Sequence, residues 1–145
     1  MQKVFFHSGD AVFRFPGKTA LKNFVGDIFK REKKPLASIH YIFCSDDYLL
    51  QINRDFLKHD FYTDIITFNL AEKGKAVEAE VFISVDRVKD NASSLGISQK
   101  EEFLRVIFHG ALHLCGYKDK TKADIKTMRG GEDYYLRLYK KRIPE

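Results

Sequence analysis

Apolar positions recur along the chain at two different spacings, and together they predict strands alternating with helices. Runs rich in β-branched and aromatic residues predict strands at Val4–Phe6, Ser38–Cys44, Asp64–Leu70 and Glu78–Val85. Apolar residues three and four apart predict helices at Thr19–Lys30, from the Ser45 cap to about Asn53, at Asp86–Leu95 and from Ser98 to about Cys115, with more helix after that. Residues 56–63 are expected to form a loop and residues 72–76 a turn. This order predicts one α+β domain over residues 1–145, with a small mixed sheet of about four strands and helices packed on it.

Composition and charge narrow the class of protein without fixing a partner. The chain has 145 residues, a net charge of +5 and a hydrophobic fraction of 44%, which is enough for a core without disulfides. Cys44 and Cys115 lie far apart in apolar surroundings and are expected to be buried free thiols. The sequence has no signal-type segment and no membrane-length apolar run, so we expect a cytoplasmic protein without membrane contact. A modest basic excess suits a polyanionic partner, but many ordinary soluble proteins share it.

One predicted helix carries the residues with the clearest chemical potential. It begins at the capping-box pattern Ser98–Glu101 and is apolar on nearly every side, which is typical of a buried helix. Its polar stripe consists of Glu102, Arg105, His109 and His113. The two histidines are four residues apart, so their rings are neighbours and can face one ion. Histidines beside a core are often ordinary buried residues, so this spacing alone is a weak indication of metal.

The residues after the second histidine strengthen the indication of a metal site. Gly116 follows His113 by three residues and Asp119 by six. A glycine ends a helix and lets the chain reverse, and extended zinc-metalloprotease sites use this spacing for a third ligand. We therefore expect His109, His113 and Asp119 to hold one divalent ion at an open, zincin-like site on a buried helix; the alternative for Asp119 is a solvated carboxylate. Gly110 stands where such peptidases carry their general-base Glu, which argues against peptide hydrolysis and predicts open space beside the ion.

Three ordered blocks of the chain resemble one known protein family. The segment His109–Asp119 reads HGALHLCGYKD, against His-Gly-x-Leu-His-Leu-x-Gly-Tyr-Asp-His in that family. Residues 52–68 resemble its block Leu-Asn-x-x-Tyr-Arg-x-x-Asp-x-x-Thr-Asp-Val-Leu-Ser-Phe, and residues 79–84 resemble Gly-Asp-Ile-x-Ile-Ser. The family is YbeY, bacterial single-strand-specific endoribonucleases of rRNA maturation, and the resemblance extends over about residues 36–138. It implies a metal-dependent nuclease of 16S rRNA processing and ribosome quality control, whose partners are single-stranded RNA, the ribosomal subunit and ribosomal proteins.

Two positions depart from the family pattern. Asp119 stands in place of the family's third His. A carboxylate is an accepted zinc ligand but makes the ion less electrophilic, so we expect Zn²⁺ first, with Mn²⁺, Fe²⁺ or Ni²⁺ as alternatives. Leu57 stands in place of an Arg that the resemblance links to substrate phosphate, and Lys58, Arg54 or His59 must substitute for it if RNA is cleaved.

The remaining site candidates follow from the hypothesis of RNA cleavage. A divalent ion polarises a phosphoryl oxygen and lowers the pKa of water, and Arg105 is expected to assist the catalytic histidines His109 and His113 by offsetting phosphate charge. Residues 98–145 hold 11 Lys and Arg against 7 Asp and Glu, and we expect substrate contacts from Lys58, Tyr117, Lys118 and Lys120. Cleft or histidine-orienting roles are expected for Asp60, Thr63, Asp64 and Glu80, the alternatives being loop hydrogen bonds and, for Glu80, cross-strand pairing. Phe56 and Tyr62 are further candidates for stacking on bases, although a core or rim role is the commoner one.

Two other functions stay open. The first is a non-catalytic ribosome-assembly factor that binds RNA and carries a structural metal site, which the basic balance and Leu57 favour. The second is metal-dependent hydrolysis of another small substrate, which rests on the site alone. Cleavage of single-stranded RNA with and without added Zn²⁺ or Mn²⁺ separates these functions.

Overall fold

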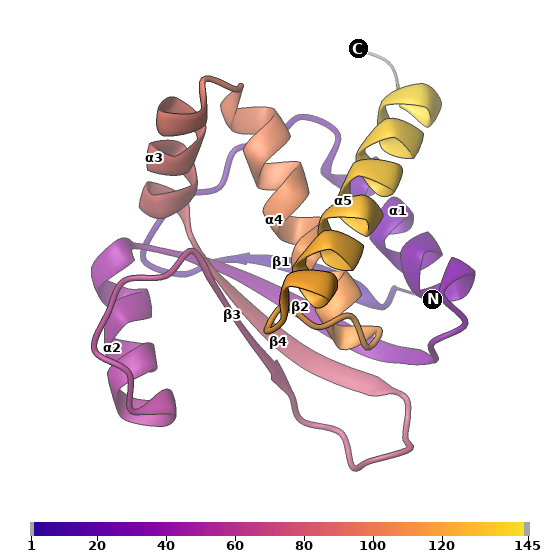
Figure 1. Cartoon of the computed structure of the whole chain (residues 1–145), viewed down its shortest axis with the longest axis horizontal. Helices are drawn as coiled ribbons and strands as arrows, with labels where there is room; N and C mark the ends of the chain where they lie inside the picture. Colours follow the sequence, from indigo (N-terminus) through magenta and orange to yellow (C-terminus); the bar gives the residue numbers. More distant parts are fainter. Residues whose placement is uncertain (1, 144–145) are drawn as a thin grey trace.

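Four strands form one mixed sheet in the computed structural model, which describes residues 2–143 (Figure 1). They are β1 (Val4–Ser8), β2 (Leu36–Cys44), β3 (Ile65–Asn69) and β4 (Val77–Ser84), in the order β1-β2-β4-β3. β1 and β4 each run parallel to β2, while β3 runs antiparallel to β4. The predicted α+β class and mixed sheet are therefore confirmed. Met1 and residues 144–145, which belong to the expected domain, lie outside the described residues.

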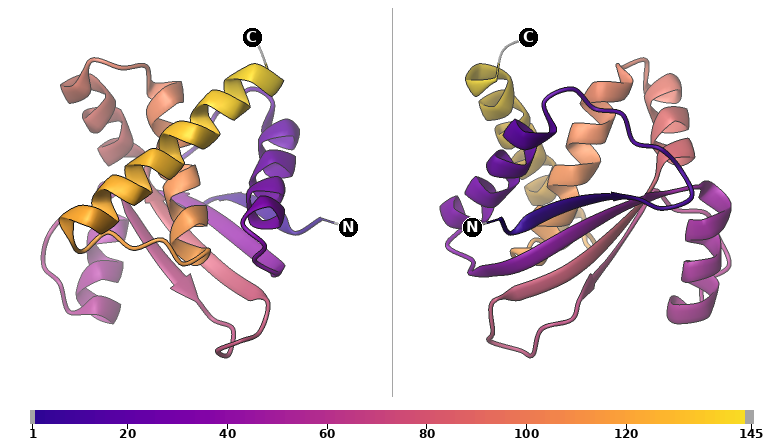
Figure 2. Two further views of the ribbon diagram at one scale, coloured as in Figure 1. Left: turned by 45° about the vertical axis from the view of Figure 1, so that its right-hand side comes forward. Right: turned by 180° about the vertical axis from the view of Figure 1, so that it is seen from behind.

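Five helices cover the sheet unequally. They are α1 (Lys18–Arg31), α2 (Asp46–Leu57), α3 (Val85–Leu95), α4 (Gln99–Leu114) and α5 (Lys122–Arg142). The views from front and back place α1, α4 and α5 on one face of the sheet and α2 on the other (Figure 2). The main core lies under the first group, and a smaller core of Cys44, Leu49, Ile52 and Ile66 lies under α2. The expected packing of helices mainly on one face is thus observed, with α2 as the exception.

α4 is the central helix of the larger layer. Ten of its residues are buried, and Ser98 Oγ accepts a hydrogen bond from the Glu101 N–H at 3.0 Å, so the predicted N-cap is present. The predicted capping box also requires the Glu101 side chain to bind the backbone N–H of Ser98. The Glu101 carboxylate pairs with Lys140 of α5 instead. Glu102, expected on the polar stripe, is buried with 5% of its surface exposed.

Gly110 lies at the contact between α4 and the sheet. A Cβ at this position would be 3.0 Å from Ile65 Cδ1 and 3.2 Å from Val81 Cγ1. The expected open space beside the ion is therefore wrong: this glycine lets the helix approach β3 and β4 closely, and the gap is filled by their side chains.

Several boundaries differ from those predicted. α2 continues through Phe56 and Leu57, which were expected in a loop, and Val85 starts α3 rather than ending β4. Both cysteines are free as expected, but the expected burial is found for Cys44 and not for Cys115, which is half-buried. Over residues 2–143, no helix is both long and apolar enough to cross a membrane.

Candidate active site

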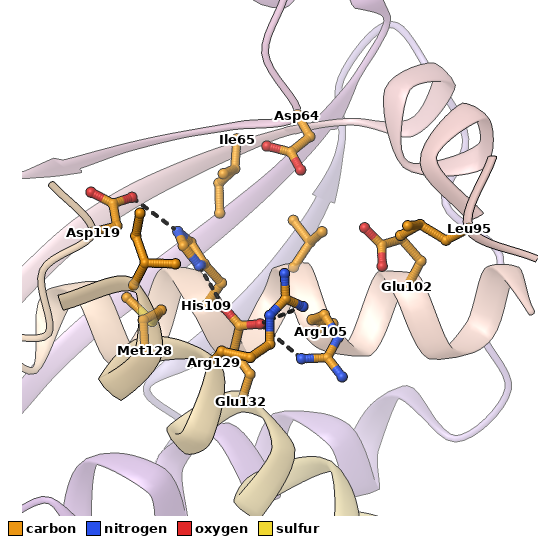
Figure 3. A pocket seen from close by; sticks show the side chains of 12 residues that line it. Asp64, Ile65, Leu95, Glu102, Arg105, His109, Asp119, Met128, Arg129 and Glu132 are labelled. Atoms are coloured by element: carbon orange, nitrogen blue, oxygen red, sulfur yellow. Dashed lines mark hydrogen bonds and ion pairs between the residues drawn. The ribbon is translucent and has the colours of Figure 1, made fainter. Parts of the chain in front are cut away.

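Two hollows meet where α4 passes the start of β3. The smaller has a volume of about 210 Å³ and opens between α3, α4 and α5 (Figure 3). The larger, of about 710 Å³, is a groove between residues 59–67 and the end of α4. Asp64, Ile65, His109 and Asp119 line both hollows. The predicted metal-binding helix therefore presents His109 at the junction of the two.

The His109 ring lies between two carboxylates, one of which is within hydrogen-bond distance. Its Nδ1 lies 2.7 Å from Glu132 Oε2, and its Nε2 lies 3.7 Å from Asp119 Oδ2 (Figure 3). Burial lowers the pKa of His109, but the hydrogen bond to Glu132 and its negative charge outweigh burial and raise the pKa. Because an ionised carboxylate only accepts hydrogen bonds, Nδ1 carries the proton. In the neutral ring, Nε2 is then the nitrogen with a free lone pair, and it faces Asp119.

Glu132 of α5 is fixed in turn by arginine. Arg105 donates from one terminal nitrogen to Glu132 Oε1 at 2.9 Å and from the other to Asp133 Oδ1 at 2.8 Å. Burial raises the pKa of Glu132, but the hydrogen bonds from His109 and Arg105 outweigh it and lower the pKa. Arg105 was expected to act on the substrate directly. The structure corrects this, because both terminal nitrogens are bound to carboxylates, and makes Arg105 a positioning residue.

The other two predicted metal ligands lie close to His109. Gly116 has a φ of 108°, a conformation that glycine tolerates, and the chain reverses there to bring Asp119 back towards the helix. His113 is exposed at the end of α4 and lines the groove with His109 and Asp119. Within the described part of the chain, no three His, Cys, Asp or Glu side chains are grouped closely enough to hold a metal ion. The three-ligand site therefore stays a prediction.

Of the four predicted substrate-binding residues, Lys120 lines the groove and the other three do not. Lys58 donates from Nζ to the Asp55 carbonyl at 3.3 Å, and Lys118 is exposed. Tyr117 packs beside Gly131, and its burial and a hydrogen bond with Glu32 raise its pKa to about 12. The half-buried Tyr117 ring thus packs against α5, and its stacking on a base stays a prediction.

The predicted cleft residues are also divided. Asp64 and Thr63 line the groove, and burial raises the pKa of Asp64. Asp60 is bound at the surface to Arg54 rather than to a histidine. Glu80 is paired in register with Phe68 and His40, on the face of the sheet away from α4, because its neighbours Ala79 and Val81 belong to the main core. The expectation that Glu80 orients a histidine is corrected accordingly.

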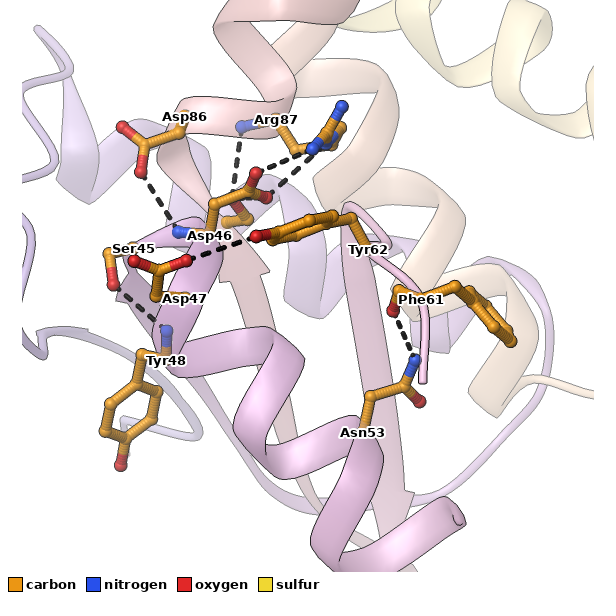
Figure 4. A network of polar contacts seen from close by, with 10 residues as sticks. Ser45, Asp46, Asp47, Tyr48, Asn53, Phe61, Tyr62, Asp86 and Arg87 are labelled. Carbon is orange, nitrogen blue, oxygen red and sulfur yellow. Dashed lines mark hydrogen bonds and ion pairs between the residues drawn. The ribbon is translucent and has the colours of Figure 1, made fainter. Parts of the chain in front are cut away.

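Two aromatic candidates point away from the site. Tyr62 donates its hydroxyl hydrogen to Asp47 at 3.4 Å, and the Arg87 guanidinium lies over its ring (Figure 4). The Phe56 ring contacts the Phe68 ring edge to face on the α2 side.

Sequence reasoning missed the two residues that organise the site. Glu132 lies in α5, far along the chain from His109, and no local pattern pairs them. Asn53 is 2% exposed, and its Nδ2 donates to the Phe61 carbonyl at 2.9 Å, which fixes the segment opposite the histidines (Figure 4). An asparagine among the apolar positions of the predicted α2 helix was the available signal.

Known proteins are similar to this chain in sequence and in fold. The sequence profile of the family described as Endoribonuclease YbeY matches residues 14–140. Relatives named Endoribonuclease YbeY from Cytophaga hutchinsonii and Flavobacterium psychrophilum are 47% and 42% identical, covering 96% and 88% of this chain and 97% and 90% of theirs. A Thermotoga maritima protein solved in solution has the same fold, with a TM-score of 0.67, 24% identity, and coverage of 96% of this chain and 90% of its own. The chain therefore belongs to the endoribonuclease YbeY family.

Proposed function

We propose that the chain is a metal-dependent endoribonuclease that cleaves single-stranded RNA in rRNA maturation, including 16S rRNA processing, and in ribosome quality control. The observation that carries the proposal is the orientation of His109. Glu132 holds its Nδ1, so Nε2 is turned to Asp119 at the junction of an open groove and a smaller hollow. Histidine ligands of metals are commonly oriented by a carboxylate in this way. The names of the relatives give the RNA substrate class.

The donor set of the site suits one divalent cation. His109, His113 and Asp119 would hold it, most simply Zn²⁺, with Mn²⁺, Fe²⁺ or Ni²⁺ as alternatives. When bound, such an ion polarises a phosphoryl oxygen and activates water for attack on a phosphodiester. The nearness of His109 Nε2 and Asp119, 3.7 Å apart, supports two of the three ligands.

The protein side chains supply position and charge. Arg105 and Glu132 fix the imidazole of His109, so less reorientation is needed when substrate arrives. Lys120 at the groove rim offsets the negative charge of the RNA backbone. Asp64 lines both hollows, and its raised pKa makes it a carboxyl there that can carry a proton.

The experiment is cleavage of a single-stranded oligoribonucleotide by the chain as purified and with added Zn²⁺ or Mn²⁺. We expect metal-stimulated cleavage that His109→Ala or His113→Ala abolishes, together with loss of bound metal in elemental analysis. His40→Ala, on the opposite face of the sheet, is the matched control and retains both. Bound metal that persists in both histidine variants contradicts the assigned ligands.

A second function is favoured by one observation. Leu57 lines the groove at the position where the resemblance places an Arg, and an apolar side chain offers no contact to phosphate. Tight rRNA binding without cleavage under any metal supports a ribosome-assembly factor with a structural metal site. Cosedimentation with ribosomal subunits in a cytoplasmic extract tests the proposed ribosomal RNA and protein partners under either function.

A further inference from the structure

An exposed aromatic pair forms part of the groove wall opposite the histidines. The His59 and Phe61 rings lie 5.1 Å apart between centroids at an angle of 21°, which is a stacked arrangement. Both residues line the groove that His109, His113 and Asp119 line from the other side. Phe61 is 55% exposed, a large apolar surface left in water. A ring face open to a groove offers a place for another flat ring.

The backbone that carries this pair is fixed. Asn53 is buried in α2, and its Nδ2 binds the Phe61 carbonyl at 2.9 Å, while the His59 N–H donates to the Asn53 carbonyl at 3.0 Å. Lys58, which directly follows α2 and precedes His59, adopts a φ of 57° and turns the chain out of the helix. Figure 4 shows the Phe61 ring directed away from α2 while its carbonyl faces Asn53. A surface held in this way loses little conformational entropy when it binds a ligand.

The charge of the groove differs between its two sides. Leu57, 39% exposed, lines the wall beside the aromatic pair, and Arg54 is bound to Asp60. Among the described residues that line the groove, Lys120 is the one with a fixed positive charge, and it lies next to Asp119. The wall near α2 is therefore apolar and aromatic, and the opposite wall can hold a phosphate.

We propose that His59, Phe61 and Leu57 form a stacking platform for one nucleobase of single-stranded RNA, beside the nucleotide whose phosphate lies at the histidines. Every base has a flat π-face, so such a platform accepts any base. In a duplex the bases stack on one another, so no base has a free face that could stack on the platform. The platform thus provides single-strand selectivity by a base contact. The proposal rests on the RNA substrate proposed above, and its test does not require cleavage.

The test measures binding of a fluorescent, nuclease-resistant 2′-O-methyl oligoribonucleotide to the full chain by anisotropy. A series of oligonucleotides carries one abasic residue at successive positions, which removes a base and keeps every phosphate. We expect one position to weaken binding by about 5- to 150-fold for the unchanged chain. Phe61→Ala should weaken binding of the intact oligonucleotide by a similar factor and be insensitive to that abasic position. Phe61→Trp should restore both the affinity and the sensitivity.

Phe56→Ala is the matched control, because Phe56 is an aromatic residue of the same region, 69% exposed, whose ring contacts Phe68 instead of the groove. It should bind and discriminate as the unchanged chain does. The platform is overturned if Phe61→Ala remains sensitive to the same abasic position, or if abasic residues have no effect anywhere and only Lys120→Ala weakens binding. It is also overturned if Phe61→Ala leaves RNA binding unchanged and instead abolishes association with a ribosomal protein. Absence of cleavage with intact, Phe61-dependent binding would reject the nuclease function alone.

Discussion

Glu132 Oε2 lies 2.7 Å from His109 Nδ1, and this contact joins α5 to the helix that presents the histidines. The carboxylate fixes both the tautomer and the direction of the ring. Its other oxygen is bound by Arg105, so the pair is held from two sides. The site is therefore organised by a contact between two helices and not by the histidine motif alone.

Glu132→Gln should remove the negative charge at His109 while keeping the size of the side chain. The hydrogen bond and charge of Glu132 raise the pKa of His109 against the effect of burial, so the pKa should fall in the variant. An NMR titration of the metal-free chain measures this fall directly. Metal affinity should drop by about 10- to 100-fold, as for other outer partners of metal ligands. Glu101→Gln, whose carboxylate pairs with Lys140 away from the site, should change neither quantity.

Glu102→Gln should stabilise the protein at neutral pH. Glu102 Oε1 is buried and has no hydrogen-bond partner among residues 2–143, and burial raises the pKa of this carboxyl above its ordinary 4.5. An acid whose pKa is raised by folding contributes stability below its unfolded pKa and loses it as pH rises through the folded pKa. The unchanged chain should thus lose stability above about pH 4.5, and Glu102→Gln should lose less. Urea unfolding at acidic and neutral pH measures the difference, and equal pH dependence of the two proteins would contradict the assignment.

Gly110→Ala and Gly130→Ala should have opposite effects on stability. Alanine improves helix propensity by about 1 kcal/mol at either position. At Gly110 the new methyl group meets Ile65 and Val81 at 3.0 and 3.2 Å, whereas at Gly130 nothing lies within 4 Å. Overpacking costs about 1–3 kcal/mol, so Gly110→Ala should lower the free energy of unfolding by about 1 kcal/mol. Gly130→Ala should raise it by up to about 1 kcal/mol in the same denaturant titration.

Leu57→Arg should strengthen RNA binding through a new phosphate contact. Leu57 lines the groove near Phe61, so an arginine there reaches the backbone of a bound strand. For single strands, each added phosphate contact makes the slope of log affinity against log salt steeper by about 0.7. Binding at several salt concentrations measures that slope. Leu57→Gln is the uncharged control, and a slope equal to that of Leu57→Arg would show that the added charge does not reach phosphate.

Cys44 should be unreactive until the protein unfolds. Burial raises the pKa of its thiol, the nearby carboxylates of Asp10, Asp86 and Asp46 act in the same direction, and together they bring the pKa to about 12. Since the thiolate is the reactive form, the folded chain should react slowly with a disulfide reagent at pH 8 and rapidly in denaturant. The raised pKa also predicts that stability falls as pH rises from about 9 towards 12. Cys44→Ser removes this part of the alkaline loss, and rapid labelling of folded Cys44 would contradict its burial.

Local patterns predicted the local features of this protein well. Helix phase placed His109 and His113 on one side of α4, and the strand alternation separated Val81 from Glu80 correctly. Alternation does not state which face receives α4, however, so it left open whether Glu80 orients a histidine or pairs across strands, and the structure favours the second. Glu132 and the role of Gly110 depend on contacts between distant segments, so no spacing within the chain could reveal them. Arg105 was on the expected stripe, but its carboxylate partners lie on α5.

The dependence of His109 on α5 has a consequence for synthesis of the chain. α4 and its two histidines leave the ribosome before Glu132 does, because α5 is translated last among the helices described. Until α5 docks, the imidazole of His109 has no carboxylate to hold it, and Arg105 has no partner on that side. A nascent chain thus carries the histidine motif in an unorganised form. Docking of α5 is therefore the folding step that completes the proposed site.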